Sequence, residues 1–394
     1  MKNSTFLFIF LCILTSCMTS ENMIRFSEEE ILLAGVENSD NFRKTANNPV
    51  VIDMNSVLEA GRIEENNLYE AIELIPLQTK KESVFQGIIQ LEMSNDRFFI
   101  KDENSDVFIF RTDGCFVKKL TRGQGPGEVY RVGSIAWDNS NQNFIVCQND
   151  ILNFYDKDGN YIRQKKCPFM FMEFYTIKNG YLFFHDRFVN KHLGDDANCA
   201  VFVSDDNFKI QAKGIAAIPS NYNYVKTMKM ILPENGKYLV SQFFNDTIFE
   251  INPNSNSLAV KYILDYREKK VTLDDFNAQI NNDKFYNMSI VYENSRSQLF
   301  QFWSRKFGLC FVLRDRTTGK MIGGTELFVD ETIVPECLFH TRNIHNDYFV
   351  SYTDAYKGMH FSSMVVDAAS NERVSDLDEE SNPVIILYKL NHIK

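Results

Sequence analysis

Short strand-like runs of apolar, aromatic and polar residues, separated by turn residues, make up most of the chain after about residue 48. Two stretches share one unit. "FIFRTDGCFVKKL" (residues 108–120) and "LNFYDKDGNYIRQKK" (residues 152–166) each join two such runs by an Asp-Gly corner. Glycine tolerates the positive φ of a tight turn, so each unit predicts a β-hairpin. Degraded copies follow in "AVFVSDDNFKIQAK", "TIFEINPNSNSLAVKYIL" and "CFVLRDRTTGKMIGG".

A further strand pair precedes each of these five hairpins, and a sixth pair follows the last one. The six pairs are "IIQLEMSNDRFFI", "SIAWDNSNQNFIV", "FYTIKNGYLFF", "MKMILPENGKYLV", "IVYENSRSQLFQFW" and "FHTRNIHNDYFV". Four-stranded units repeated at about 40 to 60 residues predict an all-β fold, a six-bladed β-propeller. The sixth unit contains only one closing strand, in "NPVIILYKL" (residues 382–390). The early strand "EAIELIPLQT" (residues 70–79) supplies the missing one. Pairing an N-terminal strand with the C-terminal blade closes the ring and removes an open sheet edge.

The N-terminus has the pattern of an export signal. Lys2 precedes an apolar run at residues 6–14 that is too short to span a bilayer, and small residues then lead to Cys17. "LTSC" resembles the bacterial lipobox, which implies that Cys17 is acylated and becomes the mature N-terminus. Met18 stands where Asp would retain a lipoprotein in the inner membrane, so the resemblance implies outer-membrane sorting. The alternative is an ordinary signal peptide with a chance cysteine.

We therefore expect three segments: a lipoprotein signal peptide at residues 1–16, a lipid-anchored tether at 17–48 and the six-bladed β-propeller at 49–394. The tether is polar and contains one predicted short helix near residues 27–34.

Three stretches carry a family resemblance. "GQGPGE" after the first hairpin, "ELIPLQT" ahead of the repeats and "NPVIILYKL" at the end resemble the six-bladed propeller lipoproteins of Gram-negative gut bacteria, distant relatives of NHL-type propellers. The resemblance covers about residues 48–394. It implies fold and cellular address, with little chemistry.

Charge and composition exclude some functions. The net charge of −10 argues against a nucleic-acid surface, which would need a basic stripe. It also argues against electrostatic docking on anionic lipid, so membrane contact is expected through the lipid anchor alone. The six cysteines that remain after Cys12 and Cys17 form no C-x-x-C, which argues against a zinc or thioredoxin-type site. They are compatible with disulfides or with buried thiols. We predict no metal site and no cofactor.

The glycine-rich stretch at residues 123–127 invites a phosphate-binding interpretation, but such a loop needs a helix after it. The sequence that follows, "VYRVGSIAWDNSNQNFIV", alternates like a strand pair. We therefore interpret the stretch as a crossover between two blades, with glycines allowing close backbone approach and proline stiffening the corner.

The strand order of a propeller places the long loops on one face. With strands a to d in each blade, the d-to-a and b-to-c connections share a face, and the a–b and c–d turns share the other. The long irregular segments at residues 187–198, 214–225, 265–284 and 354–382 all fall on the face of "GQGPGE". Binding residues are often on loops of a rigid scaffold, so function is expected there.

Candidate ligand-binding residues on that face are Arg122, Gln124, Glu128, Tyr130, Arg187, Tyr222, Tyr224 and Arg305. Tyr222 and Tyr224, with Trp303 and Arg305, suit sugars or peptides through apolar ring faces and polar tips. His185 beside Asp186 suggests acid–base chemistry, but it is equally typical of a strand end. "DENSD" (residues 102–106) imitates an EF-hand start, yet lacks its glycine and its last glutamate, so we interpret it as a turn. His340 and His345 are expected to flank an a–b turn on the opposite face.

Two functions remain open. The first is a non-catalytic, membrane-anchored lipoprotein that binds a glycan, a peptide or a cell-envelope protein, and the lack of any catalytic signature favours it. The alternative is a glycan- or peptide-directed hydrolase or lyase whose carboxylates surround the central channel. Its candidate catalytic residues are Asp102, Glu128, Asp186 and His185. It requires two carboxylates about 5 to 10 Å apart in one pocket.

Overall fold

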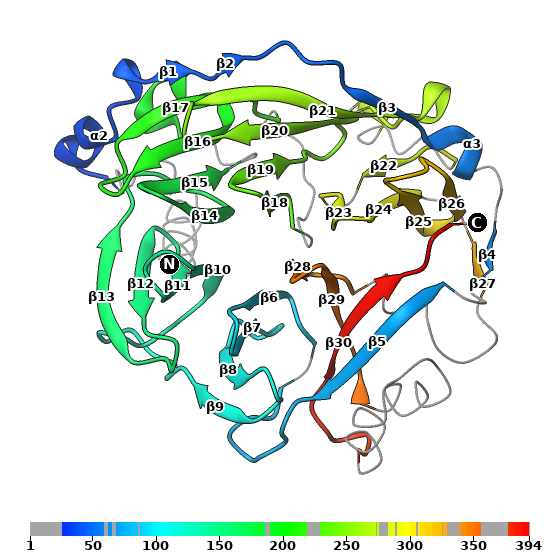
Figure 1. The fold of residues 1–394 in the computed structure, drawn as a ribbon. Helices are drawn as coiled ribbons and strands as arrows, with labels where there is room; N and C mark the ends of the chain where they lie inside the picture. The colour runs from blue at the N-terminus through cyan, green and yellow to red at the C-terminus, as the bar shows by residue number, and fades with distance from the viewer. Residues whose placement is uncertain are drawn as a thin grey trace, which may run out of the picture.

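The structure is a computed structural model of the chain. It describes residues 26–393 apart from 59–61, 65–67, 86, 186–189, 219–228, 273, 276–282, 288–289, 305, 325, 329–337, 339 and 356–376. Six sheets, each with an antiparallel core of strands, are arranged around a central axis, so the predicted six-bladed β-propeller is confirmed (Figure 1).

Blades 1 to 3 follow the chain from the centre outward. Blade 1 contains β6 (Gln90–Met93), β7 (Arg97–Lys101), β8 (Val107–Arg111) and β9 (Phe116–Lys119). Blade 2 contains β10 (Val132–Asp138), β11 (Asn143–Gln148), β12 (Ile151–Tyr155) and β13 (Tyr161–Lys166). Blade 3 contains β14 (Glu173–Ile177), β15 (Gly180–Phe184), β16 (Cys199–Asp205) and β17 (Ile210–Ala216).

Blades 4 to 6 repeat this order with two variations. Blade 4 contains β18 (Ile231–Glu234), β19 (Lys237–Val240), β20 (Thr247–Asn252) and β21 (Ser257–Asp265). In blade 5 the inner strand is split into β22 (Tyr286–Asn287) and β23 (Tyr292–Glu293), followed by β24 (Ser297–Ser304), β25 (Gly308–Asp315) and β26 (Met321–Gly324). Blade 6 contains β28 (Asn343–His345), β29 (Tyr348–Thr353), β30 (Val384–Leu390) and β5 (Tyr69–Pro76).

Blade 6 closes the ring as predicted. β5 pairs antiparallel with β30, with Leu74 opposite Ile386 and Ile75 opposite Ile385. Beyond β30, His392 Nδ1 lies 2.7 Å from Asp315 Oδ2 and so links the C-terminus to blade 5. Burial alone raises the pKa of the Asp315 carboxyl, but hydrogen bonds from Thr318 N–H, His392 and Thr317 N–H bring this pKa down to about 2.

Asp and Asn residues explain why the outer hairpins turn where they do. At the end of the third strand in blades 2 to 5, a side-chain oxygen accepts a hydrogen bond from the backbone N–H two residues further on. These residues are Asp156, Asp205, Asn252 and Asp315, with N···O distances of 2.9, 2.9, 3.1 and 2.8 Å. Such local bonds favour a turn over strand continuation. The predicted Asp-Gly corners are turns of this class: Gly114 and Gly159 have φ of 87° and 77°.

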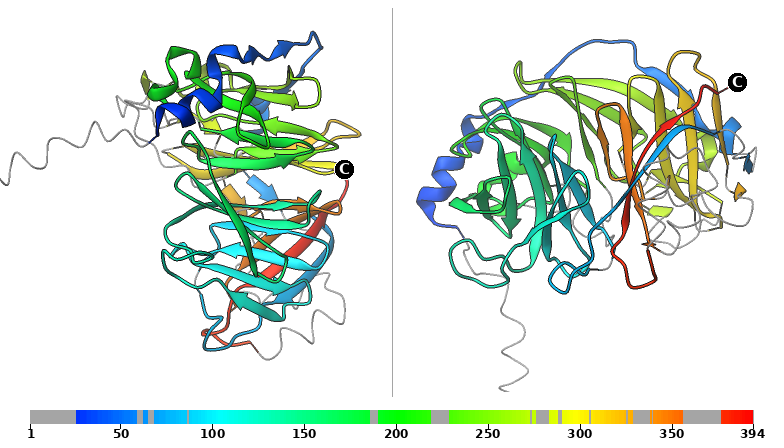
Figure 2. Two further views of the ribbon diagram at one scale, coloured as in Figure 1. Left: turned by 90° about the vertical axis from the view of Figure 1, so that its left-hand side faces the viewer. Right: turned by 60° about the horizontal axis from the view of Figure 1, so that its bottom comes forward.

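The N-terminal segment runs along the outside of the ring. α2 (Glu28–Ala34) confirms the predicted short helix, and Ser27 and Glu30 form a capping box at its start. β1 (Asp40–Asn41) pairs parallel with β17, and β2 (Arg43–Lys44) and β3 (Val50–Asp53) pair parallel with β21. After α3 (Met54–Leu58), β4 (Arg62–Glu64) pairs with β27 (Glu326–Phe328). The described part of the segment expected to be a tether, residues 26–48, is therefore packed on the outer edges of blades 3 and 4, and residues 50–64 continue along the outside of blades 4 and 5 (Figures 1 and 2).

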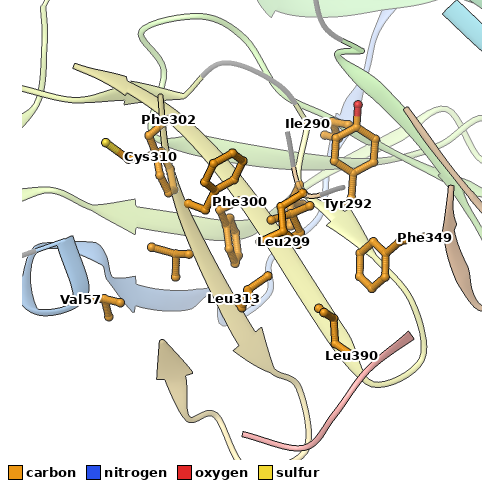
Figure 3. Close-up of a cluster of buried hydrophobic side chains, with 14 of the residues drawn as sticks. Val57, Ile290, Tyr292, Leu299, Phe300, Phe302, Cys310, Leu313, Phe349 and Leu390 are labelled. Carbon is orange, nitrogen blue, oxygen red and sulfur yellow. The ribbon is translucent and has the colours of Figure 1, made fainter. Parts of the chain in front are cut away.

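The core consists of apolar wedges between neighbouring blades. The largest cluster joins blades 4, 5 and 6 and includes Leu299, Phe300, Phe349 and Tyr388, each no more than 2% exposed (Figure 3). Because every cluster is shared by at least two blades, the blades fix one another's positions and the geometry of the central channel.

Two faces follow from the strand order. We call the face with the d-to-a and b-to-c connections the crossover face, and the face with the a–b and c–d turns the turn face. The connections from β15 to β16, β17 to β18, β21 to β22 and β29 to β30 leave and re-enter their strands at the crossover face, as the described strand order shows and as predicted.

Candidate functional site

A pocket of about 290 Å³ opens on the crossover face at the mouth of the central channel. Its lining comes from the starts of the inner strands and the ends of the second strands in five blades. The lining residues are Ile89, Gln90, Lys101, Arg131, Gly133, Ser134, Cys147, Asn149, Met170, Phe171, Met172, Glu173, Lys229 and Arg342. We call this the channel-mouth pocket.

Inter-blade hydrogen bonds fix its walls. The Gln90 side-chain amide donates to the Ile135 carbonyl at 2.6 Å and accepts from the Ile135 N–H at 3.0 Å, which joins β6 to β10. Lys101 Nζ donates to the Gly133 carbonyl at 2.8 Å. At Gly133 an added Cβ would meet no atom nearer than the Cys147 carbonyl oxygen at 3.8 Å. Gly133 therefore leaves this part of the pocket open, although its backbone conformation does not require a glycine.

The described lining has four cationic side chains and one carboxylate. Arg131 is exposed, its guanidinium lies 5.1 Å from the centre of the Tyr130 ring, and it pairs with no carboxylate among the described residues. Arg342 Nε donates to the Ile88 carbonyl at 3.4 Å, and its guanidinium lies over the Tyr352 ring. These contacts place the cations on the pocket wall.

The one lining carboxylate, Glu173, is 4% exposed and holds backbone together. Its two oxygens accept from the N–H groups of Met230 and Ile231, at 3.0 and 3.2 Å. Glu173 thereby joins the inner strands of blades 3 and 4.

An ion pair forms the floor of the pocket. Lys229 Nζ lies 3.0 Å from Glu92 Oε1, and the two side chains are 7% and 8% exposed. Glu92 Oε2 also accepts from Asn343 Nδ2 at 3.2 Å, and the Lys229 ammonium lies 5.1 Å from the centre of the Tyr175 ring. A buried pair survives only with such additional contacts, because desolvation of both charges is costly.

Two hydroxyls near this floor lack a hydrogen-bond partner among the described residues. Ser134 lines the pocket and is 3% exposed, and Tyr292 in β23 is fully buried. Burial raises the pKa of Tyr292, the Arg342 charge opposes this rise, and the Glu173 and Glu92 carboxylates add to it. The charges of Arg342, Glu173 and Glu92 therefore act on the Tyr292 hydroxyl. This hydroxyl points away from Leu313 and Leu390 in the apolar cluster (Figure 3).

A second pocket, of about 500 Å³, opens on the turn face. Its lining includes Glu92, Tyr175 and Asn343, so the floor of the channel-mouth pocket also closes this cavity from the other side. His345 lies here beside the turn between β28 and β29, as predicted, and burial lowers its pKa. His340 does not flank that turn: it precedes β28 on the crossover side, because the strand pair begins four residues later than expected.

The glycine-rich loop lies at the periphery. An added Cβ at Gly127 would lie 2.7 Å from Tyr161 Cβ in β13, the outermost strand of blade 2. Glu128 Oε2 accepts from Gly125 N–H at 2.8 Å and fills the space where Gly123 has no side chain. The loop is a crossover with an internal carboxylate cap, and it does not line the channel-mouth pocket.

The other predicted residues of blade 1 hold turns. Arg122 reaches Asp106 Oδ1 at 3.3 Å and the Asn104 carbonyl at 2.9 Å. Asp102 accepts from the Asp106 N–H at 2.8 Å, which confirms that "DENSD" is a turn, and burial raises the pKa of Asp102. Asp102 and Glu128 thus belong to separate loops, and neither lines the pocket. Gln124 and Tyr130 are exposed on the crossover side, and Tyr130 borders Arg131.

Several predicted site residues lie outside the described residues: Cys17, Asp186, Arg187, Tyr222, Tyr224 and Arg305. His185 is fully buried, with its ring 4.1 Å from that of Phe202, so it belongs to the blade interior. Trp303 in β24 is 36% exposed. The roles in ligand binding predicted for Arg187, Tyr222, Tyr224 and Arg305 stay predictions.

Sequence reasoning missed the cations at the channel mouth. Each cation stands just before an inner strand. Arg131 is one residue before β10, Lys229 two residues before β18 and Arg342 one residue before β28. A basic residue directly ahead of the first strand of several repeats was the available signal. It becomes visible once the six repeats are aligned on their inner strands.

The described residues contain no cluster of three or more potential metal ligands. Within the same residues no helix is long and apolar enough to cross a membrane. The five described cysteines form no disulfide with one another, and four of them are buried. Burial raises the pKa of Cys167, Cys199 and Cys310, which keeps these thiols protonated and unreactive.

The fold and pocket define a six-bladed β-propeller with a ligand-sized cavity at one end of its channel. The chain belongs to the family described as "Domain of unknown function (DUF4934)", which it matches over residues 49–389. No curated protein matches the sequence.

The solved structures that match this chain include the following two. The "Putative exported protein (BF0058)" of Bacteroides fragilis has a TM-score of 0.69 and 18% identity, covering 87% of this chain and all of its own. BamB from Moraxella catarrhalis has a TM-score of 0.32 and 10% identity, covering 64% of this chain and 66% of its own. The first likeness supports the fold, and the second is too weak to support an argument.

Proposed function

We propose that the protein is an exported lipoprotein, anchored in the outer membrane through Cys17, that binds a ligand or partner on its crossover face without catalysing a reaction. The observation that carries the binding role is the channel-mouth pocket. It lies on the face where the long connections gather, and its walls are fixed by bonds between blades. A preformed concave site with a few placed polar groups is typical of ligand binding.

The carboxylates near the pocket favour binding over catalysis. Glu173 is occupied by two backbone N–H groups, and Glu92 by Lys229 and Asn343. Asp102 and Glu128, the described candidates for an enzyme, hold two different loops. A glycosidase needs a pair of carboxyl groups facing one cavity.

Binding is tested with the soluble form that starts at residue 18, on glycan and peptide arrays and with cell-envelope extracts. The critical variant is Gly133→Leu, since a side chain at Gly133 has room and projects at the pocket wall. We expect it to abolish binding while the melting temperature stays unchanged. Ser140→Phe is the matched control, because Ser140 is exposed at the turn-face pocket. Equal binding by both variants would refute the assignment to the crossover face.

Anchoring is tested separately in cells. Cys17→Ser should prevent incorporation of labelled fatty acid and move the protein from the membrane to the soluble fraction, because lipid chains supply the membrane affinity. A membrane-bound, unlabelled Cys17→Ser protein would contradict the lipid anchor.

A further inference from the structure

The channel-mouth pocket has a charge opposite to that of the whole chain. The protein carries a net charge of −10, yet the described pocket lining contains Lys101, Arg131, Lys229 and Arg342 against Glu173 alone. A concave site lined by one sign of charge concentrates ligands of the opposite sign. Solubility explains an acidic surface, but it does not explain cations gathered at its centre.

The floor supplies a carboxylate partner for one of these cations. Glu92 pairs with Lys229 at 3.0 Å, and Glu173 keeps its negative charge while it accepts hydrogen bonds from two backbone N–H groups. Lys101, Arg131 and Arg342 also line the opening, in blades 1, 2 and 6. Arg131 extends from a backbone with φ of 53° and rests on the Tyr130 ring, which orients its guanidinium without a carboxylate partner among the described residues.

Buried hydroxyls supply an independent observation. The Ser134 and Tyr292 oxygens are inaccessible to solvent and lack hydrogen-bond partners among the described residues. A buried hydroxyl without a partner lowers stability, because it has lost its hydrogen bonds to water and gained none in return. Such a cost is commonly retained where a ligand or an ordered water completes the bonding. Ser134 also lines the same pocket as the cations.

The rest of the lining suits a ring that has both polar and apolar surfaces. Met170, Phe171, Met172 and Ile89 present apolar atoms beside the charged groups. The volume of about 290 Å³ is at the lower end of the range for small-molecule sites. It fits a compact ring better than an extended peptide. A sugar ring offers hydroxyls to the polar groups and CH surfaces to the apolar ones.

We infer that the channel-mouth pocket binds a carboxylate-bearing sugar, such as a uronic acid residue of an acidic glycan, with its carboxylate held by Arg131 and Lys101. The inference rests on the proposed binding role and narrows its ligand. The sugar's carboxylate replaces the missing anionic partner of Arg131, and its hydroxyls face the Ser134 side of the pocket.

The test is calorimetric titration of the soluble form with galacturonate and glucuronate disaccharides and with their neutral galactose and glucose counterparts. We expect the acidic disaccharides to bind at least about tenfold more tightly than the neutral ones, because a charge-assisted hydrogen bond contributes about 1.5–3 kcal/mol. Binding should weaken as salt rises. Arg131→Gln should lose about tenfold in affinity for the acidic disaccharides and little for the neutral ones.

Arg163→Gln is the matched control. Arg163 is also exposed and also lies over an aromatic ring, 4.0 Å from the centre of Phe154, but it stands on β13 at the outer edge. Its affinity for the acidic disaccharides should equal that of the unmodified protein. Melting curves of both variants show that each is folded.

The inference is overturned by no binding of either acidic disaccharide, by equal binding of the neutral ones, by tighter binding of tri-glutamate, or by equal losses in Arg131→Gln and Arg163→Gln. Inorganic phosphate and sulfate serve as further probes, and binding of either as tightly as the disaccharides would reject the sugar. If a neutral ligand binds and Gly133→Leu abolishes that binding, the inference of an acidic sugar is wrong and the proposed binding function stands. Binding that survives Gly133→Leu would reject both.

Discussion

At the scale of residues, the buried pair of Lys229 and Glu92 is the contact on which the channel floor depends. Both side chains are under 10% exposed, and Glu92 has further bonds only to polar neighbours such as Asn343. Lys229→Met leaves Glu92 charged and buried without its cation, so we expect a loss of about 3–5 kcal/mol in the free energy of unfolding. Urea denaturation of the soluble form measures this loss.

The double variant Glu92→Gln with Lys229→Met provides the control. Replacing both partners removes the isolated charge, so the double variant should be more stable than Lys229→Met alone. If the loss in the double variant equals the sum of the losses in Glu92→Gln and Lys229→Met, the two residues are not energetically coupled. The pair could not be predicted from the sequence, because its members are 137 positions apart and meet only through the ring. Composition and local patterns carry no information about such a partner.

At the scale of elements, the glycine-rich crossover shows how one backbone position depends on the neighbouring blade. Gly127 has φ of 77°, and a Cβ added there would lie 2.7 Å from Tyr161 Cβ. Gly127→Ala therefore combines backbone strain of about 1–2 kcal/mol with overpacking of about 1–3 kcal/mol. We expect a clear fall in the melting temperature, measured by circular dichroism.

Gly194→Ala separates the two contributions, because Gly194 has φ of 82° but no atom within 4 Å of its added Cβ. It should cost the backbone strain alone, and equal melting temperatures for the two variants would argue against the contact with Tyr161. The sequence was sufficient to interpret this loop as a corner, since strand-like alternation follows it where a phosphate-binding loop needs a helix. It was not sufficient for β1 and β2. These strands are two residues long and exposed, and they pair through backbone groups that leave no side-chain pattern.

At the scale of the whole molecule, closure was predictable because it follows from counting strands. Six openings and five complete hairpins leave one vacancy, and residues 70–79 were the remaining strand-like run before the first repeat. The chemistry of the channel was not predictable in the same way. Loop-based reasoning selected the face on which the channel-mouth pocket opens, but it selected residues on the periphery of that pocket. The inner-strand starts that line the pocket are short and lie between long loops.

Closure also predicts that β5 can act as a separable strand. β5 and the residue after it bury Ile72, Leu74, Ile75 and Leu77, each at most 3% exposed. Fully burying such a side chain contributes about 1.5–3 kcal/mol, so their sum approaches the whole stability of a typical domain. A chain that begins at residue 80 should therefore lose its cooperative melting transition and aggregate through the uncovered edge of β30. A chain that begins at residue 49 lacks α2, β1 and β2 but keeps this strand, and it should remain folded with a lower melting temperature.

Adding a synthetic peptide of residues 68–79 to the chain that begins at residue 80 tests the strand itself. The register places Leu74 opposite Ile386 and Glu73 opposite Leu387, so the peptide should restore the melting transition and the monomeric elution volume. A peptide of the same composition in scrambled order preserves hydrophobicity but moves the apolar side chains to the wrong face of the strand, since successive residues point to opposite sides. Rescue by the scrambled peptide, or a normal transition in the chain that begins at residue 80, would mean that blade 6 closes the ring by some other contact than the pairing of β5 with β30.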